Sequence, residues 1–534
     1  MSWELIAAAK RQALQDSIPS EWVIPSAISP PEDQLDVTTF PHESGFFTEF
    51  ELEITSTPAS TILSHISSGS WTSVEVTNAF CKTAAVAQQL TNCLSEIFFE
   101  SAIEQANELD AYLQRTGKTK GPFHGLPISI KDNFNVVGYD TTIGFTSLVN
   151  KPATYNSTLI DFLIEAGAVL YCKSNVPTAM MIPETVNNLF GRTVNPLNRN
   201  LTTGGSSGGE AALIAFGGSR IGVGSDIGGS LRMPAACTGL FTIRPSYGRF
   251  PNFGARACLE GQESVNGVCG PMAKTLEEIV LWASTIIAQQ PWIRDPKCLP
   301  IPWRSVETKK SLRIAVLWDD GVVRPTPPVS RALRETVEKL TVAGHEIFTW
   351  EPTGHTEILK ILEVLFFADG GKSLRDLLEP TGEPFRPEMK LYEEAQGISV
   401  YDLWQTHVSR NNVCKSYLDR WNNAGIDAIL CPTTPYSSVE NGKFTYVGYS
   451  CVWNLLDYPA VSFPCGLNAD KTVDAPYPDY QSLNPWDAKV QNDYTDSAES
   501  VHGIPVSLQL VGRKLGEESL LDMTDSVLKA IGLR

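Results

Sequence analysis

The sequence lacks any long hydrophobic run. No stretch of its 534 residues reaches the roughly 20 consecutive apolar residues that a membrane-spanning helix needs. The N-terminal sequence MSWELIAAAKRQALQDSIP predicts an amphipathic helix, and it lacks the uninterrupted apolar segment of a secretory signal peptide. We therefore expect a cytoplasmic protein.

Paired cysteine motifs and basic residues are also scarce. The eleven cysteines are an odd number and include no CxxC pair and no Cys/His spacing typical of zinc sites, so we expect free buried thiols and no metal. Lys and Arg number 42 against 60 Asp and Glu, a net charge of −18. Such a surface repels polyanions, which disfavours binding to nucleic acid or to an anionic membrane. A small-molecule substrate is expected, and a homodimer is left open.

Helical and strand-like patterns alternate along the chain. Strands are expected near residues 95–100, 126–130, 168–172, 220–224, 312–316, 428–430 and 506–511, and helices near 72–90, 101–115, 156–167, 275–287, 330–342, 357–365 and 520–530. This alternation predicts an α/β fold with a mostly buried sheet.

The chain shows no convincing linker. The most linker-like segment, residues 289–311, contains two Trp and four Pro, which suits a packed surface crossing, and strands on both sides of it resemble parts of one sheet. We therefore predict one catalytic domain over residues 55–534, preceded by an N-terminal helix and extended arm over residues 1–54. Residues 466–502 are rich in turn-forming residues and Asp, and we expect a long exposed loop there.

One stretch has a composition unsuited to a core. Residues 204–234 contain ten glycines and five serines in two clusters, separated by one predicted helix and one strand. A phosphate-binding loop would need a following Lys-Ser/Thr, which is absent. A nucleophile elbow formally matches the GxSxG pattern, but it needs a hydrophobic strand before it and a late histidine, for which only His502 is suitably placed. A purely structural glycine-rich turn is a further alternative.

A serine hydrolase that works without histidine accounts for both clusters. Ser206 and Ser230 are each flanked by glycines, and the intervening helix and strand have the length to bring the two hydroxyls side by side. A serine needs a base, and Lys131 at the end of an apolar strand could serve if desolvation lowers its pKa. A lysine that merely extends its ammonium to solvent is the alternative.

The second cluster also supplies hydrogen-bond donors for a developing negative charge. These are the backbone N–H groups of Ile227, Gly228, Gly229 and Ser230.

The motifs GLPISIKDNF, GGSSGGE, DIGGSLRMP and RPSYGR, in this order and spacing, resemble the amidase signature family, and most of all its fungal acetamidases and general amidases. The likeness extends over roughly residues 55–530. It implies a large mixed sheet covered by helices on both faces, and a Ser–cis-Ser–Lys triad. In that triad Lys131 is the base, Ser206 the bridging serine and Ser230 the acylated nucleophile.

The resemblance also suggests supporting residues. Asp226 and Arg232 match the pair that braces the nucleophile loop, although an ordinary ion pair is an equal alternative. Met180, Met181 and Trp453 are candidates for the acyl pocket, with the protein core as the alternative.

The implied reaction is hydrolysis of a carboxylic amide, such as acetamide, to acid and ammonia through an acyl-enzyme, with no metal or cofactor. Three alternatives stay open: a biosynthetic or detoxifying amidase with a bulkier substrate, the glutaminase subunit of a tRNA-dependent amidotransferase, and a catalytically silent scaffold.

Overall fold

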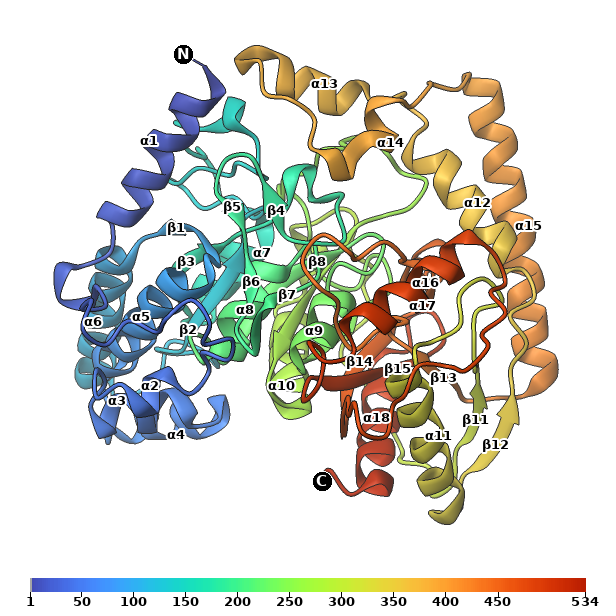
Figure 1. The fold of residues 1–534 in the computed structure, drawn as a ribbon. Helices are drawn as coiled ribbons and strands as arrows, with labels where there is room; N and C mark the ends of the chain where they lie inside the picture. Colours follow the sequence, from blue (N-terminus) through green and yellow to red (C-terminus); the bar gives the residue numbers. More distant parts are fainter. Residues whose placement is uncertain (1) are drawn as a thin grey trace.

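An eleven-stranded mixed β-sheet runs through the middle of the protein (Figure 1). The computed structural model describes residues 2–534. The order across the sheet is β1-β3-β2-β8-β10-β9-β14-β15-β13-β11-β12. The strands are β1 (Leu94–Ile97), β2 (Pro127–Lys131), β3 (Val169–Ser174), β8 (Ile221–Asp226), β9 (Phe241–Arg244), β10 (Val268–Ala273), β11 (Arg313–Val316), β12 (Glu346–Thr349), β13 (Ala428–Pro432), β14 (Ala460–Asn468) and β15 (Pro505–Val511). Two small two-stranded sheets pair β4 (Val186–Asn187) with β5 (Gly191–Arg192), and β6 (Val194–Asn195) with β7 (Asn198–Thr202).

Helices connect most of these strands. They are α1 (Trp3–Asp16), α2 (Phe40–Glu43), α3 (Glu49–Ser56), α4 (Ala59–Ser68), α5 (Ser73–Thr91), α6 (Phe99–Thr116), α7 (Thr158–Glu165), α8 (Gly208–Phe216), α9 (Arg232–Thr238), α10 (Leu276–Ala288), α11 (Pro327–Val342), α12 (His355–Phe366), α13 (Lys372–Leu378), α14 (Lys390–Glu393), α15 (Val400–Ala424), α16 (Gly448–Leu456), α17 (Pro485–Ser497) and α18 (Glu517–Ile531). The predicted α/β fold with its large mixed sheet is therefore confirmed.

The helices cover both faces of the sheet, as the alternation of side chains along β10 shows. Cys269 and Ala273 point into the main hydrophobic core, which α10 shares. Met272 points the other way, into a cluster with Ala211 of α8 and Ala235 of α9. All six residues of β10 are buried, as expected for a strand with a helix layer on each side.

The two halves of the chain occupy the two ends of the same sheet, and β10 and β11, on either side of residues 289–311, both belong to it (Figure 1). Within that crossing, Trp292 and Trp303 are partly buried against the main core, so the prediction of a packed segment is confirmed.

The prediction of a long exposed loop over residues 466–502 is wrong, because α17 lies within it. Pro485 occupies the first position of this helix, and the Asn484 side chain caps it by accepting from the amides of Trp486 and Asp487. Val490 and Tyr494, four residues apart, are buried on one side of the helix. The turn-forming residues thus mark a helix start that the acidic composition obscures.

Among residues 2–534, no helix combines the length and the hydropathy needed to cross a membrane.

Candidate active site

The candidate site lies where β2 and β8 end. These strands are parallel neighbours, with Ile128 opposite Ile221 and Ile130 opposite Val223. Because parallel strands end at the same edge of a sheet, the last residues of both strands, Lys131 of β2 and Asp226 of β8, lie at one edge. The predicted helix and strand between the two glycine–serine clusters are α8 and β8, so both clusters return to that edge.

The Lys131 side chain is completely buried and points at hydroxyl groups. Its Nζ donates to Ser206 Oγ at 2.7 Å, to Ser225 Oγ at 2.9 Å and to the Ser225 carbonyl oxygen at 3.3 Å. Burial lowers the pKa of Lys131 to about 7, although Asp226 and Glu210 act in the opposite direction. A substantial fraction of this amine is therefore neutral at physiological pH, as a general base must be.

The two serine-bearing loops are joined through the backbone. The peptide bond from Gly205 to Ser206 is cis. Ser207 donates its N–H to the carbonyl oxygen of Ser230 at 3.2 Å, and Ser206, Ser225 and Ser230 all line one cavity. The described residues show no hydrogen bond between the Ser206 and Ser230 hydroxyls, so a proton relay between them requires that contact to form.

Glu210 is a buried carboxyl group that the sequence analysis missed. Its side chain accepts from Ser174 Oγ at 2.7 Å and from Ser129 Oγ. Burial raises the pKa of Glu210 to about 7, with the two serines and Lys131 acting against the rise. The sequence could have indicated this residue, because Glu210 is the single charged residue of α8, GGEAALIAF, and lies in its first turn. Gly222 accommodates it, since a Cβ there would lie 1.9 Å from Glu210 Oε1.

Asp226 and Arg232 form a fully buried bidentate ion pair. Arg232 Nε donates to Asp226 Oδ2 at 3.0 Å, and Nη2 donates to Oδ1 at 3.1 Å. Asn454 of α16 joins both ends, donating to Asp226 Oδ1 at 2.8 Å and accepting from Arg232 Nη2 at 2.7 Å. Burial favours the neutral acid, but Arg232 and Asn454 hold the pKa of Asp226 well below its ordinary value.

This ion pair shapes the nucleophile loop directly. The amides of Gly229 and Leu231 donate to the two Asp226 oxygens at 2.8 and 3.2 Å. The Gly229 N–H therefore already has an acceptor, and the expectation that it is a free oxyanion donor is wrong. The amides of Ile227, Gly228 and Ser230 donate to no acceptor among the described residues, so they remain available.

Gly229 has a different role, in close packing. Its φ is +125°, and a Cβ there would lie 2.1 Å from Ser450 Oγ. Ser450 in turn donates to the Gly228 carbonyl oxygen at 2.8 Å. Because Ser450 belongs to α16, only glycine fits between α16 and the nucleophile loop at this position.

The cavity in front of the serines, which we call the substrate cavity, measures about 1020 Å³. Met180 and Met181 line it, as predicted for an acyl pocket. Trp453 does not: it is fully buried in the core beside His355 and Tyr417, with ring centroids 5.8 and 6.0 Å away. The prediction that Trp453 lines the acyl pocket is therefore wrong. The sequence around a single Trp does not distinguish a core position from a pocket position.

Two further side chains settle competing interpretations. His502, which a nucleophile elbow would require, is about half exposed, lies 3.7 Å from Asp470 and is not among the residues lining the substrate cavity. The interpretation of Lys131 as a solvent-directed surface lysine is also wrong, since none of its surface is exposed.

Part of the cavity wall has an uncommon backbone conformation. Ile143, Ala179 and Met180 have φ of 41°, 61° and 59°, in the left-handed region that side chains other than glycine rarely adopt. Each such residue costs on the order of 1 kcal/mol or more. The bond from the Ala179 amide to the Ile143 carbonyl oxygen, 3.0 Å, ties the two segments together.

Taken together, a partly neutral buried amine touches a serine hydroxyl, and a second serine stands beside unoccupied backbone amides. Such an arrangement can deprotonate a hydroxyl and stabilise an oxyanion. Comparison with known proteins agrees with a hydrolase of this kind. A profile described as Amidase matches residues 75–521.

The chain is 41% identical to an acetamidase of Emericella nidulans, covering 99% of this chain and 98% of that protein. It is 39% identical to an acetamidase of Aspergillus oryzae, covering 99% of both chains. A solved structure of a fatty acid amide hydrolase superposes with a TM-score of 0.95 at 34% identity, covering 99% of this chain and 95% of that one. The chain thus belongs to the amidase signature family and is a hydrolase of amide bonds.

Proposed function

We propose that this hydrolase converts a carboxylic amide to the acid and ammonia through an acyl-enzyme on Ser230. The observation that carries the proposal is the 2.7 Å hydrogen bond from the fully buried Lys131 amine to Ser206 Oγ, in the cavity that Ser230 also lines. Lys131 lies behind the cavity wall and reaches the cavity through the hydroxyls of Ser206 and Ser225. Among the described residues, the lysine that lines the cavity itself is Lys297, which is half exposed and paired with Glu263.

The reaction proceeds in two halves. Ser230 Oγ forms a bond to the amide carbonyl carbon while its proton passes to Ser206, whose own proton passes to neutral Lys131. The amides of Ile227, Gly228 and Ser230 stabilise the negative oxygen.

The proton then returns through the same hydroxyl to the leaving nitrogen, and the C–N bond breaks to release ammonia. Water attacks the resulting ester with Lys131 again as base, which frees the carboxylic acid and restores Ser230.

The proposal is tested by ammonia release from purified protein. Ser230→Ala should abolish turnover, and Lys131→Ala should reduce it by several orders of magnitude. Ser219→Ala is a matched control, because Ser219 is a buried serine of the same stretch whose hydroxyl donates to the Ile221 carbonyl oxygen outside the cavity. Near-normal turnover of Ser230→Ala would overturn the assignment of the nucleophile.

For the substrate, a small monocarboxylic amide such as acetamide is the first candidate, supported by the two acetamidases. A bulkier amide is the second, supported by the size of the substrate cavity, which lies at the upper end of the range for sites of drug-sized ligands. Apolar side chains of the wall, such as Met181, Phe253 and Leu377, would contact a long or aromatic acyl group.

An amide panel graded from acetamide to aryl and long-chain amides distinguishes the two. A kcat/KM that rises with acyl size supports the bulkier class, and one that falls supports acetamide. With glutamine added, the panel also separates a free-standing amidase from a glutaminase subunit, which would need its partners and would prefer glutamine. A silent scaffold would release no ammonia from any member. A cytoplasmic location is part of the proposal and is supported by the eleven cysteines, all free thiols.

A further inference from the structure

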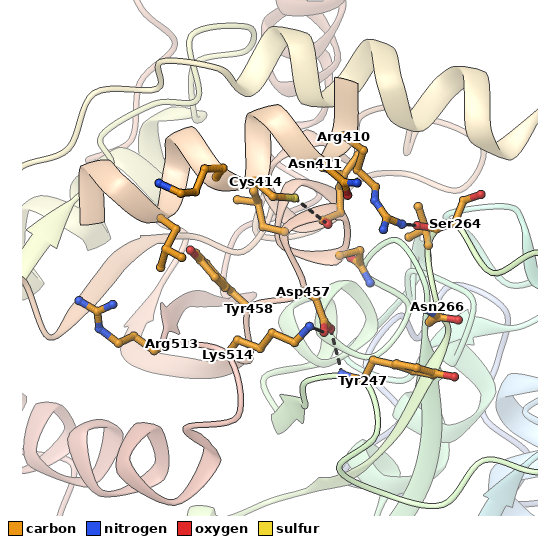
Figure 2. A pocket seen from close by; sticks show the side chains of 16 residues that line it. Tyr247, Ser264, Asn266, Arg410, Asn411, Cys414, Asp457, Tyr458, Arg513 and Lys514 are labelled. Atoms are coloured by element: carbon orange, nitrogen blue, oxygen red, sulfur yellow. Dashed lines mark hydrogen bonds and ion pairs between the residues drawn. The ribbon is translucent and has the colours of Figure 1, made fainter. Parts of the chain in front are cut away.

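A second cavity, which we call the basic cavity, lies between α15, the end of α16 and the segment after β15 (Figure 2). Its volume is about 520 Å³. One carboxylate, that of Asp457, lines it. The cationic side chains that line it are Arg410, Lys415, Arg513 and Lys514. The whole chain carries a net charge of −18, so this local excess of positive charge runs against the composition.

The cations of the basic cavity are only partly neutralised: Lys415 is paired with Asp419 on the same helix, but two of the others have no acidic partner in the described part of the chain. Among residues 2–534, no acidic side chain lies within ion-pair distance of Arg410 or Arg513. Arg410 donates to the Ser264 carbonyl oxygen, and Arg513 donates to the Asn422 side-chain oxygen at 2.7 Å. A guanidinium has five N–H donors, so both retain donors for a further acceptor.

The single carboxylate, Asp457, is shared by several donors. Lys514 Nζ lies 2.9 Å from one of its oxygens, while Arg244 Nη2 and the Tyr247 amide lie 3.0 and 2.9 Å from the other. One negative charge therefore serves both the buried Arg244 and the half-exposed Lys514. In Figure 2, Lys514 extends to Asp457, whereas Arg410 extends from α15 toward the backbone of Ser264.

The basic cavity adjoins the substrate cavity. Tyr247, Val265 and Asn266 line both. The floor of the basic cavity includes Asn454, whose side chain is bonded to both members of the ion pair that shapes the nucleophile loop. An occupant would therefore sit one side chain away from the catalytic machinery.

We propose that the basic cavity is a binding site for a small oxyanion, a carboxylate or phosphate group held between Arg410 and Lys514. Guanidinium and ammonium groups bind such oxygens through charge-assisted hydrogen bonds. Two sources share this chemistry: the carboxylic acid that the enzyme itself releases into the adjoining cavity, and a free inorganic anion.

The test is calorimetric titration of the full-length protein with inorganic phosphate and, separately, with acetate, at constant ionic strength set by chloride. We expect saturable binding of one anion per chain. Arg410→Gln and Lys514→Gln should each weaken it about tenfold or more, since each removes a charged donor. Lys514→Gln leaves Asp457 paired with Arg244, so the fold is retained, and thermal unfolding checks this.

Two controls are matched in position and partner. Lys309 is 60% exposed and paired with Asp427, much as Lys514 is 52% exposed and paired with Asp457. Arg420, also on α15, donates to backbone carbonyl oxygens as Arg410 does. Lys309→Gln and Arg420→Gln should bind the anion within about twofold of the parent.

The outcomes are distinct. If acetate competes with phosphate and slows ammonia release, the site takes the enzyme's own product; if phosphate binds and acetate does not, it takes a free anion. Absence of saturable binding for both anions, or equal affinity in all four variants, overturns the proposal. The titration is repeated on Ser230→Ala. This variant should bind the anion as the parent does, so failure of the proposed reaction and failure of the anion site can be told apart.

Discussion

Replacement of Lys131 by methionine should make the protein inactive and, at neutral pH, more stable. Methionine has a similar length and no charge, so it fills the space of the lysine without its ionisation. A residue kept only for the fold would show the opposite change in stability. This substitution therefore separates a functional role from a structural one.

The expected change in the free energy of unfolding follows from the lowered pKa of the buried Lys131 amine. Burial lowers the pKa of Lys131 from 10.5 to about 7, so between these values the unfolded chain binds a proton that the folded chain does not. Stability consequently rises with pH over this window, and at pH 7, where the buried amine is half protonated, the folded state carries a cost of about 4 kcal/mol compared with pH above 10.5. Methionine removes that cost but also loses the hydrogen bonds of the neutral amine, whose two N–H groups serve two of the three acceptors around it at about 1 kcal/mol each. We expect a net gain of about 2 kcal/mol.

The assay is urea-induced unfolding at pH 7 and pH 9, with recovery of the signal on dilution, for the parent and Lys131→Met. The stability difference between them should shift by about 2 kcal/mol in favour of the parent between the two pH values, because other titrations cancel in the difference. Lys309→Met, at an exposed lysine, should show no such shift. A difference that is independent of pH, or a variant less stable than the parent at pH 7, would refute a neutral buried amine.

Three further predictions concern the surroundings of the site. Arg232→Met leaves its carboxylate partner buried without a counter-ion, so it should lower stability by about 3–5 kcal/mol and abolish ammonia release, measured by thermal unfolding and turnover. Glu210→Gln keeps its hydrogen-bonding shape but removes a group that raises the pKa of Lys131, so the acid limb of the kcat/KM profile should move to lower pH; an unchanged limb would show that the carboxyl is neutral in the active enzyme. Met181→Ala should change KM across the amide panel with little effect on stability, whereas Trp453→Phe should lower stability and leave the ranking of substrates unchanged, so a reversed pattern would contradict their placement.

Much of the site could be predicted because its determinants are local in sequence. Most of the glycines around Ser206 and Ser230, such as Gly205 and Gly229, leave no room for a Cβ. A lysine that ends a buried apolar strand is poorly solvated, which favours its neutral form. Helix α5 could be placed to within a residue from the capping box of Thr72 and Glu75.

The remaining features depend on contacts between distant segments. Whether the Gly229 amide is free depends on where the Asp226 carboxylate turns, and whether Trp453 lines a pocket depends on the packing of α12 and α15. The size of the substrate cavity is set by segments around residues 143, 180, 253 and 377, which no short-range pattern brings together.

The bracing of the nucleophile loop by α16 has a consequence for the newly made chain. Arg232 needs Asn454, 222 residues further on, and Gln509, 277 residues further on, to satisfy its buried guanidinium. When both glycine–serine clusters have been synthesised, the serines are present, but the residues that satisfy Arg232 are not yet part of the chain. Catalytic competence is therefore reached only when β15 has been added, so a chain truncated before Gln509 carries the complete signature of the enzyme without the support its nucleophile loop needs.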